Sequence, residues 1–162
     1  MKKAFTLVEI LVTIAVIGTI SATIVPTLSH YLPGIQLNGD AKVLSSTLRE
    51  AQEKTITEQK NYLVHFYPTS APYYEICYLV AKTETSCRRE TLRGSESMTI
   101  LDNNNQTITD NFGPPFPASP INNRIVFSPD GGPSSAANIT LMLNSNSKII
   151  NISPAGFINI TN

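Results

Sequence analysis

The 162-residue chain has no tryptophan, only two cysteines and few charged residues, 15%, with twelve cations balancing twelve anions. A formal net charge of zero gives no overall attraction for nucleic acid or anionic lipid, although local patches stay open. The two cysteines, Cys77 and Cys87, do not form a C-x-x-C pair, and no histidines cluster with them. A zinc site is therefore not expected.

Catalytic and nucleotide-binding motifs are also missing. The sequence has no glycine-rich phosphate loop, no His-Glu metal helix and no Gly-x-Ser-x-Gly elbow. His65 alternates within a predicted strand and has no nucleophile or carboxylate at motif spacing, so we expect a structural role for it. Asp130 precedes a glycine in a turn and is too isolated for a calcium loop. We expect no enzymatic activity, no metal and no cofactor.

The sequence does contain one long apolar run, residues 5–25, with a single ionisable side chain, Glu9. As a helix rising about 1.5 Å per residue, the run would span roughly 30 Å, the hydrocarbon thickness of a bilayer. A charged carboxyl there costs on the order of 2.5–3.5 kcal/mol near the bilayer centre, so we expect a cationic partner for it. Lys2 and Lys3 are the only cations before the run, which predicts a cytoplasmic N-terminus and an exported remainder.

A partner for Glu9 could come from proteolysis. Cleavage between Ala4 and Phe5 would remove both lysines and create an α-amino group four residues from Glu9, where it could pair with the Glu9 of a neighbouring copy. Two other interpretations of the run are a cleaved secretory signal and a plain single-pass anchor. The first normally has a shorter apolar region of about 7–15 residues, and the second requires only that an interfacial carboxylate is tolerated.

The N-terminus resembles the class III signal of type IV pilins and pseudopilins. The resemblance rests on Lys-Lys-Ala, followed by Phe5-Thr6-Leu7-Val8-Glu9 and an apolar run. The resemblance implies that prepilin peptidase cuts before Phe5 and methylates its amine, that Glu9 guides assembly, and that the apolar helices pack into a filament core. Ala4 departs from the family pattern, which usually has glycine there, and this puts the efficiency of cleavage in question. Pro26 stands where many pilins carry a helix-distorting proline.

A second helical pattern follows Pro26 and the Pro33-Gly34 pair, which we expect to bend or locally unwind the helix. Apolar residues recur every three or four positions, and charged residues lie mostly off this stripe, which predicts an amphipathic helix with one face against a sheet. A kinked helix, half in the membrane and half in the exported domain, is the expected arrangement. The stripe consists of Leu37, Ala41, Leu44, Leu48, Ala51 and Thr55 or Ile56.

From residue 61 the pattern changes to the alternation typical of strands. Strands at 62–67 and 73–80 are predicted to form a hairpin, and a third at 87–92 to fold back over a turn. If that turn is symmetric about Lys82, Cys77 and Cys87 lie opposite each other with Cα atoms about 4.5 Å apart, within disulfide range. We expect this disulfide in an exported domain; the alternative is two buried free thiols.

The remaining strands are predicted to be short. One strand at 98–101 precedes a long surface loop over 102–123, and an antiparallel meander comprises 124–127, 138–143, 148–152 and 157–160. The expected fold class is α+β, a long, partly transmembrane N-terminal helix packed on an antiparallel β-sheet domain. The expected division of the chain is a leader, 1–4, an apolar helix, 5–25, its amphipathic continuation, 26–57, and an exported domain, 58–162.

The exported part is similar to the GspH/FimT family of minor pseudopilins and minor pilins. The similarity rests on Leu48-Arg49-Glu50-Ala51-Gln52, on Ile125-Val126-Phe127-Ser128-Pro129-Asp130-Gly131, and on Pro154-Ala155-Gly156-Phe157-Ile158. It implies a helix packed on two antiparallel sheets. It also implies a structural subunit of a type II secretion pseudopilus or a type IV pilus, inserted in the bacterial inner membrane, with prepilin peptidase and other pilins as partners.

Two alternatives to a filament subunit stay open. Some FimT-type pilins are associated with DNA uptake, and Arg88, Arg89 and Arg93 form a local basic cluster, although acidic residues lie among them. The other alternative is a membrane-anchored domain without a filament role, which an unprocessed Lys2-Lys3 end would favour.

Overall fold

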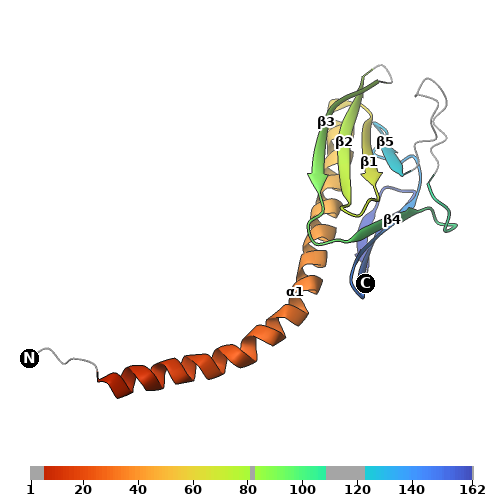
Figure 1. Cartoon of the computed structure of the whole chain (residues 1–162). Coiled ribbons are helices and arrows are strands. Elements are labelled where there is room, and N and C mark those ends of the chain that lie inside the picture. The colour runs from red at the N-terminus through yellow and green to blue at the C-terminus, as the bar shows by residue number, and fades with distance from the viewer. Residues whose placement is uncertain (1–5, 81–82, 109–122, 162) are drawn as a thin grey trace, which may run out of the picture. The chain divides into compact units, whose positions relative to one another are not determined.

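The structure is a computed structural model that describes residues 6–80, 83–108 and 123–161. The chain forms two compact units, 1–33 and 34–162. In the described parts, one long helix is followed by strands alone (Figure 1). The elements are α1 (Leu7–Glu58), β1 (Tyr62–Tyr67), β2 (Tyr73–Val80), β3 (Thr83–Thr91), β4 (Ser97–Leu101), β5 (Arg124–Phe127), β6 (Ala137–Leu143), β7 (Asn146–Ile152) and β8 (Ile158–Thr161).

The first unit contains the N-terminal part of α1, whose apolar side chains face outward. Leu7–Ile24 is an 18-residue stretch with a mean hydropathy of 2.2 and none of it buried, so it is long and apolar enough to cross a membrane. The hydroxyls of Thr13, Thr19 and Thr23 each donate to the backbone carbonyl three residues earlier, at 2.8–2.9 Å. These bonds satisfy the hydroxyl donors within the helix, which lowers the cost of placing them in an apolar solvent.

Helix α1 continues through Pro26 and Pro33 without a break, so the local unwinding predicted there does not occur. Each proline removes one backbone hydrogen bond and costs about 3 kcal/mol or more in a helix interior. The unbroken turns on either side of each proline nevertheless keep the backbone helical. The kink expected at Pro26 stays a prediction.

The C-terminal part of α1 belongs to the second unit and buries one face. Its predicted apolar stripe is confirmed, and Thr55 rather than Ile56 completes it: Ile56 is 48% exposed. The Thr55 hydroxyl donates to the Ala51 carbonyl at 2.8 Å, so a polar side chain can be buried there with its donor satisfied. The stripe positions that are at most 1% exposed are Leu37, Ala41, Leu44, Leu48, Ala51 and Thr55.

The first sheet has the strand order β3-β2-β1-β5, and all its neighbours are antiparallel. Strands β1 and β2 form the predicted hairpin, with Tyr62 opposite Tyr78. In Figure 1 this sheet lies beside the C-terminal part of α1. The two elements also share a buried polar contact, because the hydroxyls of Thr47 on α1 and Tyr74 on β2 lie 3.2 Å apart. The sheet and the amphipathic half of the helix therefore enclose one core.

The second sheet has the strand order β4-β6-β7-β8. Strands β6, β7 and β8 form a meander, but β5 pairs with β1 of the first sheet, Ile125 lying opposite Val64. The prediction of a single meander from residue 124 onward is therefore wrong. All four residues of β5 are buried, and a strand buried on both faces specifies no partner through its own alternation. Packing in the core decides that partner instead.

The side chain of Gln52 joins α1 to two turns that are distant in the sequence. Its Nε2 donates to the carbonyl of Gly131 at 2.7 Å and to that of Gly156 at 3.2 Å. Both glycines have positive φ angles, 82° and 83°, a region where residues with a Cβ are strained. A Cβ at position 156 would also meet Gln52 Nε2 at 2.5 Å.

Replacing Gly156 by alanine is therefore expected to lower the free energy of unfolding by about 1–3 kcal/mol, from backbone strain and from displacement of the Gln52 amide. Denaturant unfolding of the full chain in detergent, followed by circular dichroism, measures this. Gly39 on α1 is the matched control, since a Cβ there meets open space. Gly39→Ala should stabilise the helix by up to about 1 kcal/mol, and equal destabilisation by both changes would contradict the prediction.

The predicted surface loop, 102–123, lies mostly outside the described residues, which stop at 108 and resume at 123. Its described beginning is a tight turn, in which Asp102 Oδ1 accepts bonds from the backbone N–H groups of Asn104 and Gln106, both at 2.8 Å. Ile108 then enters the main core, 3% exposed. The start of this segment is thus fixed to the domain.

Candidate functional site

Glu9 lies in the first turn of α1, next to the predicted processing positions Ala4 and Phe5, which fall outside the described residues. Thr6 caps the helix: the backbone N–H of Glu9 donates to the Thr6 carbonyl at 3.1 Å and to its Oγ1 at 3.3 Å. Thr-x-x-Glu is the capping-box pattern. The spacing of Thr6 and Glu9 signals this cap, although the cap was not predicted from the sequence.

The carboxyl group of Glu9 is exposed at the head of the apolar stretch, and within the described residues it forms no ion pair. A negative charge near a helix N-terminus gains about 0.3–1 kcal/mol from the helix dipole. That gain is smaller than the cost of roughly 2.5–3.5 kcal/mol for a charge deep in hydrocarbon. Capping alone therefore does not offset the cost of a carboxylate in hydrocarbon, whereas a cationic partner would.

Cys77 and Cys87 form a disulfide between β2 and β3, with their Cα atoms 4.2 Å apart. The register of the two strands shifts between Ile76 and Tyr78, and Ser86, next to Cys87, has a positive φ of 50°. These are the features of a β-bulge. The pairing is symmetric about residue 82 only on the side of the bulge away from the turn, where Tyr73 pairs with Thr91 and Ile76 with Arg88. Between the bulge and the turn the register differs by one residue from the predicted simple turn, because the bulge adds an unpaired residue to β3.

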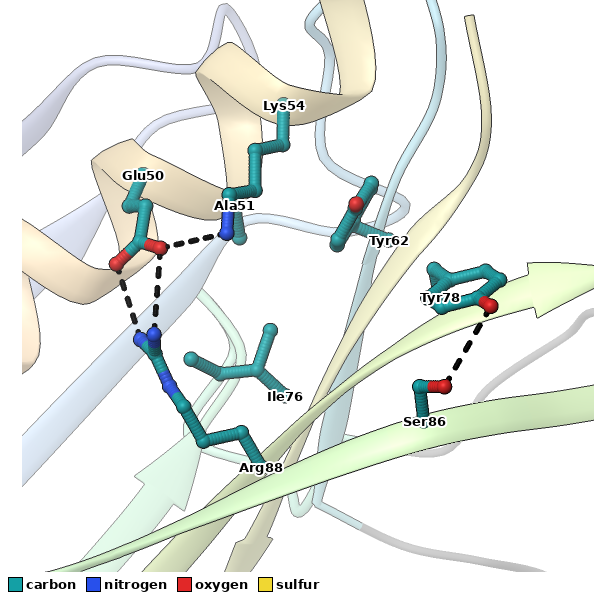
Figure 2. Close-up of a pocket in the computed structure, with 8 residues that line it drawn as sticks. All are labelled: Glu50, Ala51, Lys54, Tyr62, Ile76, Tyr78, Ser86 and Arg88. Atoms are coloured by element: carbon teal, nitrogen blue, oxygen red, sulfur yellow. Dashed lines mark hydrogen bonds and ion pairs between the residues drawn. The ribbon is translucent and has the colours of Figure 1, made fainter. Parts of the chain in front are cut away.

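A pocket of about 220 Å³ opens between α1 and the first sheet (Figure 2). On its helix side the Glu50 carboxylate accepts contacts from two cations, Lys54 Nζ at 2.8 Å and Arg88 Nη2 at 3.0 Å. Arg88 Nε also lies 3.4 Å from a carboxylate oxygen of Glu90. The charges at the rim therefore balance each other. The lining residues are Glu50, Ala51, Lys54, Tyr62, Ile76, Tyr78, Ser86 and Arg88.

The pKa directions in this pocket follow from the same contacts. Hydrogen bonds from Lys54 and Arg88 hold the pKa of Glu50 below its ordinary value. The bond to Glu50 in turn raises the pKa of Arg88. Burial, followed by a hydrogen bond with Glu58, raises the pKa of Tyr62. Each group is thereby held in its ordinary charge state near neutral pH, which suits a structural network between helix and sheet.

Replacing Glu50 by glutamine is expected to cost under about 1 kcal/mol at neutral pH, because the side chain is 39% exposed and solvent screens its ion pairs. The folded-state pKa of Glu50 is lowered, so its contribution is present above the unfolded pKa and is lost as the pH falls through the folded one. The stabilities of wild type and variant should converge in acid. Denaturant titrations at several pH values test this, and a constant gap across the range would contradict it.

The three arginines predicted as a basic cluster do not form one patch. Arg88 and Arg89 lie on opposite faces of β3, because successive side chains of a strand alternate. Arg88 contacts the carboxylate of α1, whereas Arg89 pairs with Glu75 at 2.7 Å and stacks over the Tyr73 ring at 4.4 Å. Arg93 lies beyond the end of β3 and is exposed. Two of the three cations are thus already paired with carboxylates.

His65 is 6% exposed and lies on the same face of the first sheet as Arg89. The Tyr67 hydroxyl is 3.4 Å from His65 Nδ1 and donates to Glu75 Oε2 at 3.1 Å. These contacts agree with the structural role expected for His65. In the described residues no group of three or more His, Cys, Asp or Glu side chains could hold a metal ion.

Comparisons with known proteins match the N-terminal motif and the fold of this chain separately. Residues 1–25 match the prokaryotic N-terminal methylation motif. The minor pseudopilin EpsH from the type 2 secretion system of Vibrio cholerae has a similar fold in two solved structures, with TM-scores of 0.59 and 0.61 and 11% and 10% identity. These likenesses cover 77% and 78% of this chain, and 94% and 95% of the EpsH chains.

A pilin of a second filament system shows the same likeness. The type IV minor pilin FimU of Pseudomonas aeruginosa strain PAO1 superposes with a TM-score of 0.56 and 13% identity, over 78% of this chain and 88% of FimU. No curated protein matches the chain by sequence. A helix packed on antiparallel sheets is therefore shared with both a secretion pseudopilin and a pilus pilin, as the sequence predicted for the fold.

Proposed function

We propose that this protein is a minor pseudopilin or minor pilin, a structural subunit of a type II secretion pseudopilus or a type IV pilus. The observation that carries the proposal is the methylation motif at the head of the apolar stretch Leu7–Ile24, none of which is buried. That stretch is the N-terminal half of α1, and the C-terminal half of the same helix contributes buried residues to the core of the pilin-like domain. Such a chain can be inserted in a membrane and can then leave it to pack its apolar helix against the apolar helices of other subunits in a filament. We assign it no enzymatic activity.

Processing precedes assembly in this proposal. Prepilin peptidase cuts between Ala4 and Phe5 on the cytoplasmic side and methylates the new amine of Phe5. Lys2 and Lys3 hold the uncut end in the cytoplasm through the positive-inside bias, so the second unit is exported across the bacterial inner membrane. The Cys77–Cys87 disulfide supports an exported location, since such bonds persist in oxidising compartments.

Assembly then uses the charge of Glu9. The carboxylate lacks a partner within the described residues of its own chain, and the Phe5 amine of the adjacent subunit supplies one at a similar depth. Addition in register removes an unpaired charge from lipid, whereas addition out of register leaves it there. The charge pair therefore sets the axial position of each subunit, and the apolar side chains of α1 supply contact area.

DNA uptake has less support as a second function. Arg88 and Arg89 are held by carboxylates and lie on opposite faces of β3, so a DNA strand following one face would meet only one of them. A membrane-anchored domain without a filament role would keep its Lys2-Lys3 end.

Crosslinking of the full-length protein in cells, with mass spectrometry of its neighbours and of its own N-terminus, tests the proposal. A chain that begins at methylated Phe5 and crosslinks to secretion pseudopilins would be a pseudopilus subunit. Pilins as neighbours would make it a pilus subunit. Retention of Met1 with no pilin-like neighbour would overturn the filament function.

A further inference from the structure

The outward face of the second sheet is formed by side chains without charge, in a chain where 15% of residues are charged. Antiparallel register places these side chains in rows that cross all four strands. One row runs from β4 to β8 through Leu101, Asn138, Asn151 and Asn159. Three neighbouring strands, β6, β7 and β8, thus each contribute one amide side chain to this row.

A parallel row lies two residues away along each strand. It consists of Thr99, Thr140, Ile149 and Thr161, so hydroxyl groups replace the amides. We call these two rows the neutral face. The rows are outward because the residues that alternate with them, such as Ile139 and Ile150, are fully buried, while Asn138 and Asn151 are only half-buried.

The neutral face is hollowed rather than flat. A depression of about 460 Å³ is lined by members of both rows and by Asn105. Across its floor, Asn151 Nδ2 donates to Asn138 Oδ1 at 2.6 Å. An amide has two N–H donors and a carbonyl with two lone pairs, so this bond leaves the NH2 group of the Asn138 amide and the carbonyl oxygen of the Asn151 amide able to bond with a ligand. The face therefore presents donors and acceptors side by side.

This chemistry suits a ligand whose groups both donate and accept hydrogen bonds and carry no charge, which describes sugar hydroxyls. Neighbouring strands are about 4.8 Å apart, close to the length of one sugar unit in an extended chain. Leu101 and Ile149 add apolar contacts for the C–H side of a sugar ring. We propose that the neutral face binds an extended segment of uncharged polysaccharide that crosses the strands of the second sheet.

An anionic polymer fits this face less well, because neither row contains a cation to neutralise it. The inference goes beyond the filament function and does not depend on it, since the neutral face belongs to the second unit and lacks the residues of the methylation motif.

Calorimetric titration of the full-length protein tests the inference. The protein is kept in a polyoxyethylene detergent, which has no sugar headgroup, and titrated with cellohexaose, maltohexaose and chitohexaose, and with an oligogalacturonate as an anionic comparison. We expect at least one neutral oligosaccharide to bind and the anionic one to bind at least about tenfold more weakly. Asn151→Asp should weaken the neutral ligand by at least about tenfold, because it replaces an amide by a charged acceptor.

Asn146→Ala is the matched control, since Asn146 lies on the same strand but outside both rows. It should bind like wild type, and circular dichroism should show both variants folded. Absence of binding by all three neutral sugars, equal binding of the anionic one, or equal effects of the two substitutions would overturn the inference. Sedimentation measures self-association: dimers lost in Asn151→Asp would show that a second copy covers the face, which would also overturn it.

Discussion

Replacing Glu9 by glutamine is expected to leave the protein inserted in the membrane and to reduce its crosslinking to neighbouring subunits by at least about tenfold. Glutamine keeps the length of the side chain and can still serve a capping box, but it cannot form an ion pair with an α-amino group. The free energy that favours in-register addition of a subunit becomes smaller, because the variant has no charge in lipid to neutralise. A loss of about 2 kcal/mol lowers the equilibrium constant for addition roughly thirtyfold. Crosslinking yield in cells, normalised to membrane-bound protein, measures the loss.

Thr6→Ala separates the two roles of this turn. It removes the hydroxyl that accepts from the Glu9 backbone, at a cost of about 1 kcal/mol in helix stability, but leaves the carboxylate in place. We expect Thr6→Ala to enter the filament at near wild-type levels, once mass spectrometry shows that both variants are cleaved before Phe5. If Thr6→Ala is as impaired as Glu9→Gln, helix capping rather than charge pairing is the role of Glu9.

Removal of the disulfide is expected to have the largest effect on stability. The bond closes a short loop between residues ten apart in sequence, and such a loop stabilises a protein by about 2–3 kcal/mol in the chain-entropy model. A variant with Cys77→Ala and Cys87→Ser should therefore melt roughly 10 °C lower than wild type. Thermal unfolding in detergent, followed by circular dichroism, tests this.

Reductant supplies the control for the disulfide. It should lower the melting temperature of wild type to about that of the double variant and leave the variant unchanged. Loss of the disulfide should also disturb the pocket between α1 and the first sheet, because Ser86 and Arg88, which flank Cys87, line that pocket. A melting temperature that is indifferent to both reductant and substitution would contradict the predicted contribution of the bond.

Local patterns predicted most elements of this fold. The apolar run of residues 5–25, the stripe from Leu37 to Thr55 and the strands at 62–67 and 73–80 each depend on a short period of apolar residues, which the sequence displays directly. Helical hydrogen bonds join residues four apart, so a helix can be recognised from a short window. The same periodicity predicts which face of the C-terminal half of α1 is buried.

The sequence by itself thus determined the apolar stretch that is long enough to cross a membrane, the N-terminal methylation motif, the amphipathic helix and the positions of most strands. Only the tertiary structure decided that β5 pairs with β1, that Arg88 and Arg89 meet different carboxylates, and that Asn138, Asn151 and Asn159 form one row. Each of these depends on contacts between residues far apart in the chain. Such contacts are selected by the burial of both partners and by loop-closure entropy, neither of which is encoded in a local period.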